Sequence, residues 1–139
     1  MLLTELWRDY LPDHQGASPT NAATIAPASW GNVATWNTGN SNGRKLVTQA
    51  GIAPSESLMG RAFKWRIRLY DSTAATYTTL RQYCVPSGGE AVDPFVSYLM
   101  DPTGDVLQIL VDFYNTSSTY TIPIGAVFAW IKGSRQTTG

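Results

Sequence analysis

Residues 61–70 read RAFKWRIRLY, and in this stretch apolar and polar side chains alternate strictly. The apolar ones occupy every second position from Phe63 to Leu69, and Lys64, Arg66 and Arg68 lie between them. Successive side chains of a β-strand point to opposite faces of its sheet, so this spacing predicts a strand with one buried and one solvated face. Such half-buried sheets are usually antiparallel.

Similar segments follow along the chain, separated by turn-forming residues. Residues 76–85 are rich in Thr and Tyr and predict a returning strand, while residues 95–100 are apolar on both faces, which favours a central strand. Further strands are expected at 106–114, 119–122 and 126–132. The spacing of roughly 8 to 12 residues between strands is typical of a sandwich or a jelly roll.

The sequence therefore predicts an all-β fold, an antiparallel β-sandwich or jelly roll of about 7–9 strands with a short N-terminal helical or irregular segment. We expect the core to contain the apolar residues that alternate along the strongest strands: Phe63, Trp65, Ile67, Leu69, Leu107, Ile109, Val111, Phe113 and Ile131.

The two ends of the chain differ in composition from its middle. Apolar residues near the start recur at the spacing of one helical face: Leu2, Leu3, Leu6, Trp7 and Tyr10. Residues 12–28 show neither helical nor strand periodicity and predict an extended strap. We therefore divide the chain into an N-terminal segment and strap (1–29), a β-sandwich domain (30–133) and a tail (134–139). The tail has no apolar residue and is expected to fray.

Charged residues make up 14 % of the chain, and ten basic residues balance ten acidic ones. About 25 % is usual, so much of the surface is made of uncharged polar groups, which lose water at lower cost and suit contact with protein or glycan. We expect a homo-oligomer. A balanced charge supplies no field for strong nucleic-acid binding or for attraction to an anionic membrane.

The residues needed for catalysis or metal binding are scarce. The chain has one histidine, His14, in the expected strap, and one cysteine, Cys84, which cannot form an internal disulfide. A catalytic triad would have to use His14, and a zinc site needs several such ligands. Asp93 and Asp101 each precede a proline, which is typical of turns. The sequence predicts no enzyme activity, no cofactor and no metal site.

The first residues of the chain lack the sequence features of a secretory signal peptide. Charges at Glu5, Arg8 and Asp9 interrupt its apolar residues, so we expect no signal peptide. A run of about 18 apolar residues, which a membrane-spanning helix needs, is also missing. We expect a soluble chain without membrane insertion.

Three groups of residues are candidates for contacts. Lys64, Arg66 and Arg68 share one strand face and could meet RNA, a sulfated glycan or a receptor, or could form a solvated face that discourages unwanted strand pairing. Trp30 and Trp36 lie outside the strong strands and are the best candidates for platforms beneath a sugar. The N-terminal apolar face is too short to fold alone and is a candidate for self-association: Leu2, Leu3, Leu6, Trp7 and Tyr10.

The strand sequences carry a family resemblance. The segments FKWRIRLY (63–70), DVLQILVDFY (105–114) and YTIPIGAVFAWIKG (120–133) resemble a capsid domain from a small non-enveloped RNA virus, in particular the protruding domains of nodavirus and tombusvirus-like coat proteins. The resemblance implies a virion protein of the capsid surface that forms dimeric or trimeric spikes, or a capsid lattice, and touches a host receptor. LLTELWRDYLPDHQG (2–16) would then lie beside the linker from a shell domain.

A carbohydrate-binding β-sandwich, such as a lectin, is the alternative. The chain has many aromatic rings that could cover a sugar face, although aromatic residues at period 2 belong to the core more often. Glycan binding by the monomer would favour this class. Stable self-association without sugar would favour the capsid class.

Overall fold

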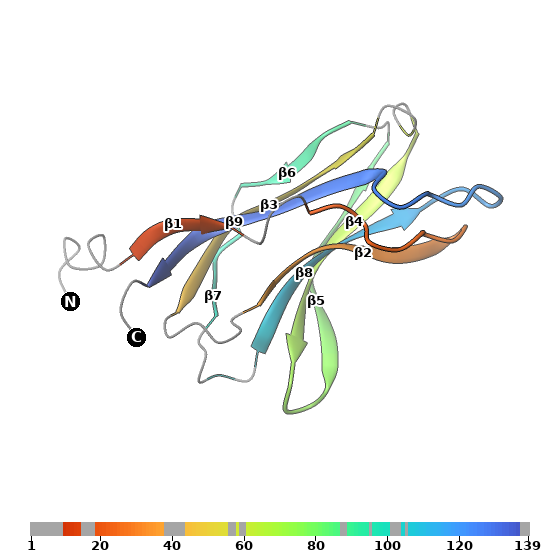
Figure 1. The fold of residues 1–139 in the computed structure, drawn as a ribbon. Coiled ribbons are helices and arrows are strands. Elements are labelled where there is room, and N and C mark those ends of the chain that lie inside the picture. The colour runs from red at the N-terminus through yellow and green to blue at the C-terminus, as the bar shows by residue number, and fades with distance from the viewer. Residues whose placement is uncertain are drawn as a thin grey trace.

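The computed structural model describes residues 10–14, 19–37, 44–55, 58, 61–86, 89–94, 96–100, 104 and 106–136. In this part the chain is all-β, with nine strands and no α-helix. The strands form two sheets packed face to face (Figure 1). The predicted antiparallel β-sandwich is confirmed. No helix in these ranges is long and apolar enough to cross a membrane.

The first sheet has the order β1-β9-β3-β6, with β7 also paired to β3. Its strands are β1 (Tyr10–His14), β9 (Val127–Gln136), β3 (Lys45–Pro54), β6 (Ala91–Asp93) and β7 (Tyr98–Met100). The short β6 and β7 pair with residues 50–52 and 45–47 of β3, so they share one edge.

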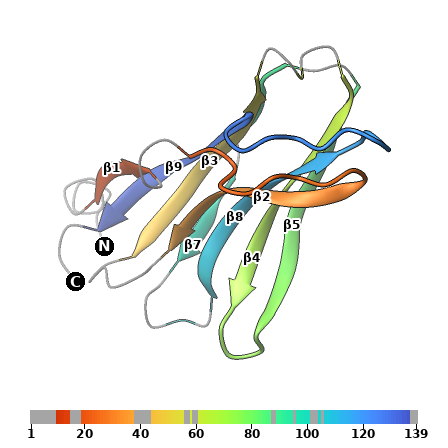
Figure 2. The ribbon, with the colours of Figure 1, turned by 45° about the vertical axis from the view of Figure 1, so that its right-hand side comes forward.

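The second sheet has the order β2-β8-β4-β5. Its strands are β2 (Ser29–Asn37), β8 (Val106–Asn115), β4 (Phe63–Asp71) and β5 (Thr76–Val85). The chain crosses between the sheets at every connection except β4 to β5 and β6 to β7 (Figure 2). With β6 and β7 counted as one interrupted edge strand, this interleaved order is that of a jelly roll.

The core fills the space between the inner faces of the two sheets. Of the predicted core residues, seven are buried: Phe63, Trp65, Ile67, Ile109, Val111, Phe113 and Ile131. Leu69 is partly buried and packs against them, and the side chain of Leu107 lies outside the described residues. Trp65 is the largest fully buried side chain. The core also includes apolar residues that the sequence analysis did not single out: Ile25, Val47, Ile52, Met100, Ile122 and Val127.

Both ends of the chain depart from expectation. Tyr10–His14 was expected in the N-terminal segment and strap, but it forms β1 and pairs with residues 132–136 of β9. That pairing also orders residues 134–136, which we expected to fray, because each strand supplies the ladder hydrogen bonds of the other. Residues 1–9 and 137–139 lie outside the described part, as does the expected N-terminal helix.

Residues 19–28 of the predicted strap form no named strand and are held to the sandwich by hydrogen bonds. The side chain of Asn21 is fully buried; its Nδ2 donates to the carbonyl oxygen of Pro123, and its Oδ1 accepts from the backbone N–H of Val127. Ile25 pairs with Ile122 through two backbone hydrogen bonds. The strap therefore covers one end of the core.

Two elements of the first sheet differ from the sequence analysis. Residues 95–100 were expected to form a central strand, but β7 covers three residues at an edge, where it pairs with β3 alone. The interior strands of this sheet are β9 and β3, and the sequence analysis did not identify β3. A register shift between Val47 and Gln49 breaks its alternation, so its buried residues do not follow a simple period of two.

Candidate functional site

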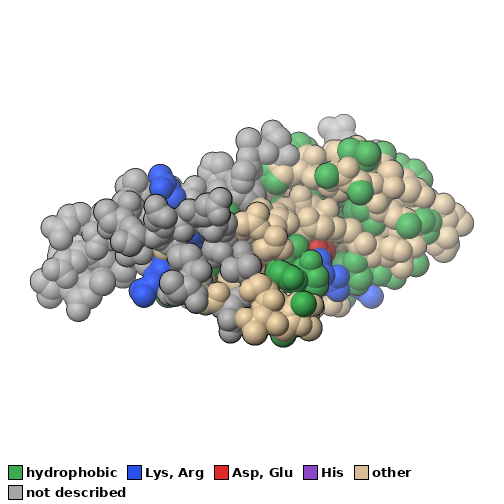
Figure 3. All heavy atoms as spheres, turned by 60° about the horizontal axis from the view of Figure 1, so that its bottom comes forward, with side chains coloured by type: hydrophobic (Ala, Val, Ile, Leu, Met, Phe, Trp, Pro, Cys, Tyr) green, Lys and Arg blue, Asp and Glu red, His purple; other side chains and the backbone are tan. Residues whose placement is uncertain are grey.

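The outer face of the second sheet gathers most of the candidate contact residues. Lys64, Arg66 and Arg68 project from β4 on this face, as their alternation with buried residues predicted. The pairing of β4 with β8, and of β8 with β2, brings further polar and aromatic residues beside them. We call the group the cationic face: Trp30, Lys64, Arg66, Arg68, Tyr77, Asp112 and Tyr114. Figure 3 shows such a mixture, with Lys and Arg side chains beside hydrophobic ones and an acidic side chain between them.

Asp112 is the centre of the cationic face. Its carboxylate is 1 % exposed, and it lies directly opposite Arg66 in the β4–β8 register. Arg66 Nε donates to Oδ2 over 2.8 Å, and Arg68 Nη2 donates to Oδ1 over 3.2 Å. Arg68 Nε also forms an ion pair with Oδ2, but the angle at its N–H does not meet the geometry of a hydrogen bond. A buried carboxylate is tolerated only with such partners, so it fixes both guanidinium groups.

Each cation of this face also lies over an aromatic ring. The guanidinium carbon of Arg66 is 4.1 Å from the ring centroid of Trp30, and that of Arg68 is 4.4 Å from the ring of Tyr77. The ammonium of Lys64 is 5.0 Å from the ring of Tyr114. Such contacts contribute about 0.5–1 kcal/mol each at exposed sites. They hold the cations in fixed positions on the sheet surface.

This arrangement suits binding rather than catalysis. The cationic face contains three cations and one carboxylate, which leaves it locally positive, and Tyr77 is 52 % exposed. Fixed guanidinium groups beside an exposed ring can bind an anionic group or stack on a planar one. Among the described residues no group of three or more His, Cys, Asp or Glu is placed to hold a metal ion.

Trp36 does not belong to the cationic face, contrary to its choice as a sugar platform. Its spacing from Trp30 is even, which would place both rings on one side of a regular strand. A bulge between Asn32 and Ala34 shifts the register and turns Trp36 inward, where it is 4 % exposed. Trp30 stays on the outer face and packs edge-on against Tyr114, with ring centroids 5.1 Å apart.

The residues chosen for self-association lie almost entirely outside the described part: Leu2, Leu3, Leu6 and Trp7. Tyr10 is described as the first residue of β1, so it belongs to a strand and not to the helical face that the spacing predicted. Its side chain is not among those described.

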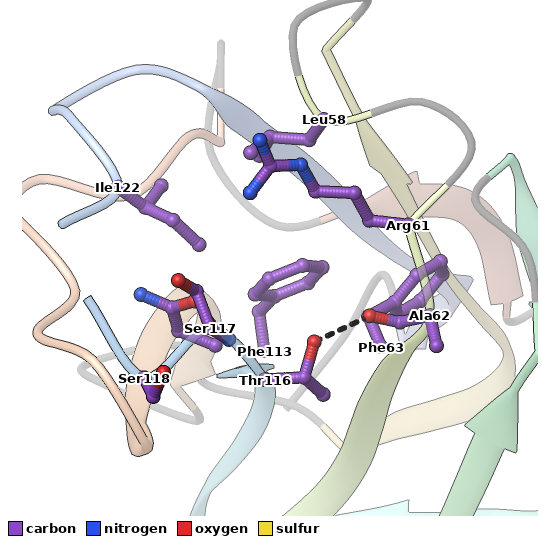
Figure 4. Close-up of a pocket in the computed structure, with 10 residues that line it drawn as sticks. Leu58, Arg61, Ala62, Phe63, Phe113, Thr116, Ser117, Ser118 and Ile122 are labelled. Atoms are coloured by element: carbon purple, nitrogen blue, oxygen red, sulfur yellow. Dashed lines mark hydrogen bonds between the residues drawn. The ribbon is translucent and has the colours of Figure 1, made fainter. Parts of the chain in front are cut away.

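A pocket of about 480 Å³ lies where β4 begins and β8 ends, beside the loop that follows β8. In Figure 4 the ring of Phe113 lies at its centre, with Arg61 and Leu58 on one side and Ser117 on the other. Its polar groups already serve the fold. Thr116 donates to the carbonyl oxygen of Ala62, and the guanidinium of Arg61 lies over the ring of Tyr120. We therefore favour the cationic face as the functional site.

Residues 115–117, Asn-Thr-Ser, match the N-glycosylation acceptor pattern, but the asparagine is not accessible in the folded chain. Asn115 is 3 % exposed, and its Nδ2 lies within 3.2 Å of three carbonyl oxygens, those of Ile25, Ala26 and Tyr120. Glycosylation would need that amide nitrogen to be free and accessible. Asn115 therefore organises the loop that precedes β9 and joins it to the strap.

A second polar cluster ties the two sheets together at the β5 edge. The hydroxyl of Tyr83 on β5 donates to the buried carboxylate of Asp93 on β6, and Arg81 Nε lies 3.5 Å from the same carboxylate. Burial, and then the hydrogen bond to Asp93, raise the pKa of Tyr83. The hydrogen bond between Arg81 and Tyr83, followed by the charge of Asp93, raises the pKa of Arg81.

Comparison with known proteins shows the fold. No protein-family model matches the chain, and no curated protein matches it. A solved structure of Desmodium yellow mottle tymovirus has a TM-score of 0.53 and 10 % identity, covering 93 % of this chain and 86 % of that one. Tobacco streak virus coat protein has a TM-score of 0.47 and 12 % identity, covering 93 % and 88 %. PirA also has a TM-score of 0.47, with 9 % identity, covering 90 % and 93 %.

At these identities the likeness concerns the fold and nothing further. Of these three structures, the tymovirus one exceeds a TM-score of 0.5. The likenesses to Tobacco streak virus coat protein and to PirA lie below that score and carry no argument.

The sequence analysis missed Asp112 as part of the site. It lies in a strongly apolar segment, and its position opposite Arg66 depends on the pairing of β4 with β8. The available signal was a lone acidic residue on the polar side of an otherwise apolar strand.

Proposed function

We propose that this chain is a structural subunit of a small RNA-virus capsid, in which copies of the domain assemble with one another. The observation that carries the proposal is the interleaved strand order, β1-β9-β3-β6 against β2-β8-β4-β5. This jelly-roll order is used by viral capsid domains, as well as by lectins and cupins. The fold likeness to the tymovirus structure agrees with it.

The chemistry of the surface supports assembly. With 14 % charged residues, much of the exterior consists of hydroxyl, amide and aromatic groups. Several large apolar side chains are also exposed, among them Ile124 at 65 % and Phe128 at 50 %. Such faces lose their water at lower cost than faces rich in Lys and Glu, so contacts between copies are favourable.

The finer form of the proposal places the domain in projections at the virion surface, where the cationic face contacts a host receptor. Its fixed cations and the exposed ring of Tyr77 would bind an anionic or planar group of that receptor. The N-terminal apolar residues are the proposed second surface for self-association: Leu2, Leu3, Leu6, Trp7 and Tyr10.

Assembly is tested by sedimentation and electron microscopy of the full chain. We expect discrete oligomers or particles at ~100 μM, since specific assembly has affinities in the micromolar range or tighter. A wild-type chain that sediments as a monomer at that concentration contradicts the proposal.

The receptor contact is tested separately with heparin as the anionic probe. Lys64→Ala with Tyr77→Ala should reduce retention on a heparin column, and neither residue pairs with the buried Asp112. Lys132→Ala is the matched control, because Lys132 is exposed on the opposite sheet. Equal loss of retention in both variants would contradict a contact at the cationic face.

A carbohydrate-binding module is the second candidate, and the outward ring of Trp30 beside Arg66 is the observation that favours it. A glycan array probed with the monomer tests it. Binding of a defined glycan that is lost in Trp30→Ala, by a chain that does not self-associate, would replace the capsid proposal.

A further inference from the structure

Strand β5 is an exposed sheet edge whose backbone has one register shift, at Leu80. It forms the outer end of the β2-β8-β4-β5 sheet, and within the described part of the chain it pairs with β4 alone. Eight of its ten residues are exposed, including Tyr77 at 52 % and Leu80 at 37 %. The β4–β5 hairpin also extends beyond the body of the sandwich (Figure 2). Such an edge presents unpaired N–H and C=O groups to any strand that can align with it.

The other sheet edges carry the features that usually prevent strand pairing. β1 contains Pro12, Asp13 and His14 in five residues, and β6 and β7 have three residues each. β2 has a bulge between Asn32 and Ala34. Proline, charge, short length and bulges all discourage edge-to-edge association.

β5 is less protected than these edges. Its sequence TYTTLRQYCV contains no proline, no glycine and one charge, and Thr and Tyr favour strands. A single register shift at Leu80 leaves regular segments on either side, at 76–79 and 81–85. The charge, on Arg81, is paired with the buried carboxylate of Asp93 over 3.5 Å. Two copies of this edge would therefore meet without repulsion between uncompensated charges.

We propose that β5 is a homotypic interface, in which two copies of the chain pair their β5 strands antiparallel and join two four-stranded sheets into one continuous sheet. The inference rests on the proposed function, because it names one contact by which the subunits associate. Main-chain hydrogen bonds supply its affinity, and the exposed side chains of Tyr77 and Leu80 become partly shielded beside the joined strands.

A second copy is the occupant that the geometry favours. A strand that pairs antiparallel with its own copy generates a two-fold axis, and the contact closes as a dimer. Pairing of β5 with β2 of another copy would instead leave one β5 and one β2 edge free, and the contact would continue as an open ribbon.

The test adds carboxylates to the edge without disturbing the monomer. In Thr79→Glu with Gln82→Glu, the new carboxylates lie opposite Arg68 and Arg66 within the same chain, so the β4–β5 pair is maintained. Across a β5–β5 contact the same carboxylates gather at a shared edge. Like charges that face each other across an interface oppose its formation, so we expect association to weaken by more than about tenfold in sedimentation velocity.

The matched control is Thr48→Glu with Thr121→Glu, which adds the same two charges at exposed threonines away from β5. It should associate as the wild type does, and circular dichroism should show an unchanged β-fold in all variants. Equal association of the edge variant and the wild type would overturn the β5 interface while leaving assembly itself intact. A monomeric wild type at ~100 μM would overturn both proposals.

A second measurement uses the single cysteine of the chain, Cys84, which is exposed on β5. A spin label at Cys84 should give one narrow distance between the two labels of a dimer, because a paired strand has one register. Oligomers or particles without a discrete Cys84–Cys84 distance would contradict the interface. The Thr79→Glu, Gln82→Glu variant should lose that distance.

Discussion

The two faces of strand β4 are built on different principles, although their residues alternate along one stretch of chain. The inner face consists of Phe63, Trp65 and Ile67, each at most 3 % exposed. The outer face consists of Lys64, Arg66 and Arg68, held by Asp112 and by aromatic rings from β2, β5 and β8. Burial stabilises the first face, and specific pairs of groups stabilise the second.

This difference determines how each face responds to change. An apolar core tolerates exchange between side chains of similar size, because the energy depends on area and volume. A network around one buried carboxylate depends on the identity of each partner, because an unpaired buried charge is costly. The loss of stability caused by a substitution should therefore increase with the volume removed on the inner face. On the outer face it should depend on which ion pairs and hydrogen bonds are lost.

The largest effect is expected at the inner face. Trp65 is 1 % exposed and stacks on Tyr83 with ring centroids 4.9 Å apart. Trp65→Ala should lower the free energy of unfolding by about 3–5 kcal/mol, measured by denaturant titration. A loss below about 1 kcal/mol would mean that the two faces of β4 are assigned the wrong way round.

A smaller but still large effect is expected at the centre of the outer face. Asp112→Asn keeps the shape of the side chain and removes the charge that Arg66 and Arg68 share. Removing one partner of a fully buried pair costs 3–5 kcal/mol, but these arginine side chains are 19 % exposed, so we expect about 2–3 kcal/mol.

Asp71→Asn is the matched control for this substitution. The Asp71 carboxylate accepts hydrogen bonds from the backbone N–H groups of Thr73 and Ala74 in an exposed turn, and an asparagine oxygen can accept the same bonds. It should cost well under about 1 kcal/mol. Equal losses at positions 112 and 71 would show that Asp112 is not a structural centre.

The same contrast explains how much the sequence could predict. Period-two alternation located β4 and β8 and most of the core, because burial is a property of each residue and of its face, and the Thr- and Tyr-rich composition of residues 76–85 located β5. β3 was missed and Trp36 was wrongly expected to be exposed. In each strand a register shift moves the alternation of buried and exposed side chains by one residue. The role of Asp112 could not be predicted, because it depends on register between strands about 46 residues apart.

The hydrogen bond between Tyr83 and Asp93, which joins the two sheets, should give a pH-dependent contribution of intermediate size to the free energy of unfolding. The pKa of Tyr83 is raised, chiefly by burial and then by its hydrogen bond to Asp93. The stability it contributes is therefore fully present below the ordinary tyrosine pKa of about 10 and is lost as the pH rises above it. Tyr83→Phe should cost about 1 kcal/mol at neutral pH through the lost hydrogen bond.

Unfolding followed from neutral to alkaline pH checks this expectation. The stability of the wild type should fall above pH ~10, and Tyr83→Phe should show a shallower fall. Burial also raises the pKa of Tyr98, so some dependence on pH should persist in the variant. Parallel curves for wild type and variant would contradict the assignment to Tyr83.

The smallest expected effect is the coupling energy between Trp30 and Arg66. It tests whether the side chains of the outer face hold fixed positions. The guanidinium carbon of Arg66 is 4.1 Å from the ring centroid of Trp30 and is held there by Asp112. A double-mutant cycle of Trp30→Ala and Arg66→Ala should give a coupling energy of about 0.5–1 kcal/mol in denaturant titrations. The cycle is needed because Arg66→Ala alone also removes a partner of Asp112.

Lys64 and Trp30 both contact Tyr114, but no direct contact joins them among the described interactions, so the cycle of Trp30→Ala with Lys64→Ala should give a coupling near zero. Equal coupling in the two cycles would mean that the outer face is a general polar surface, and a fixed arrangement of cations for an anionic partner would then lose its structural basis.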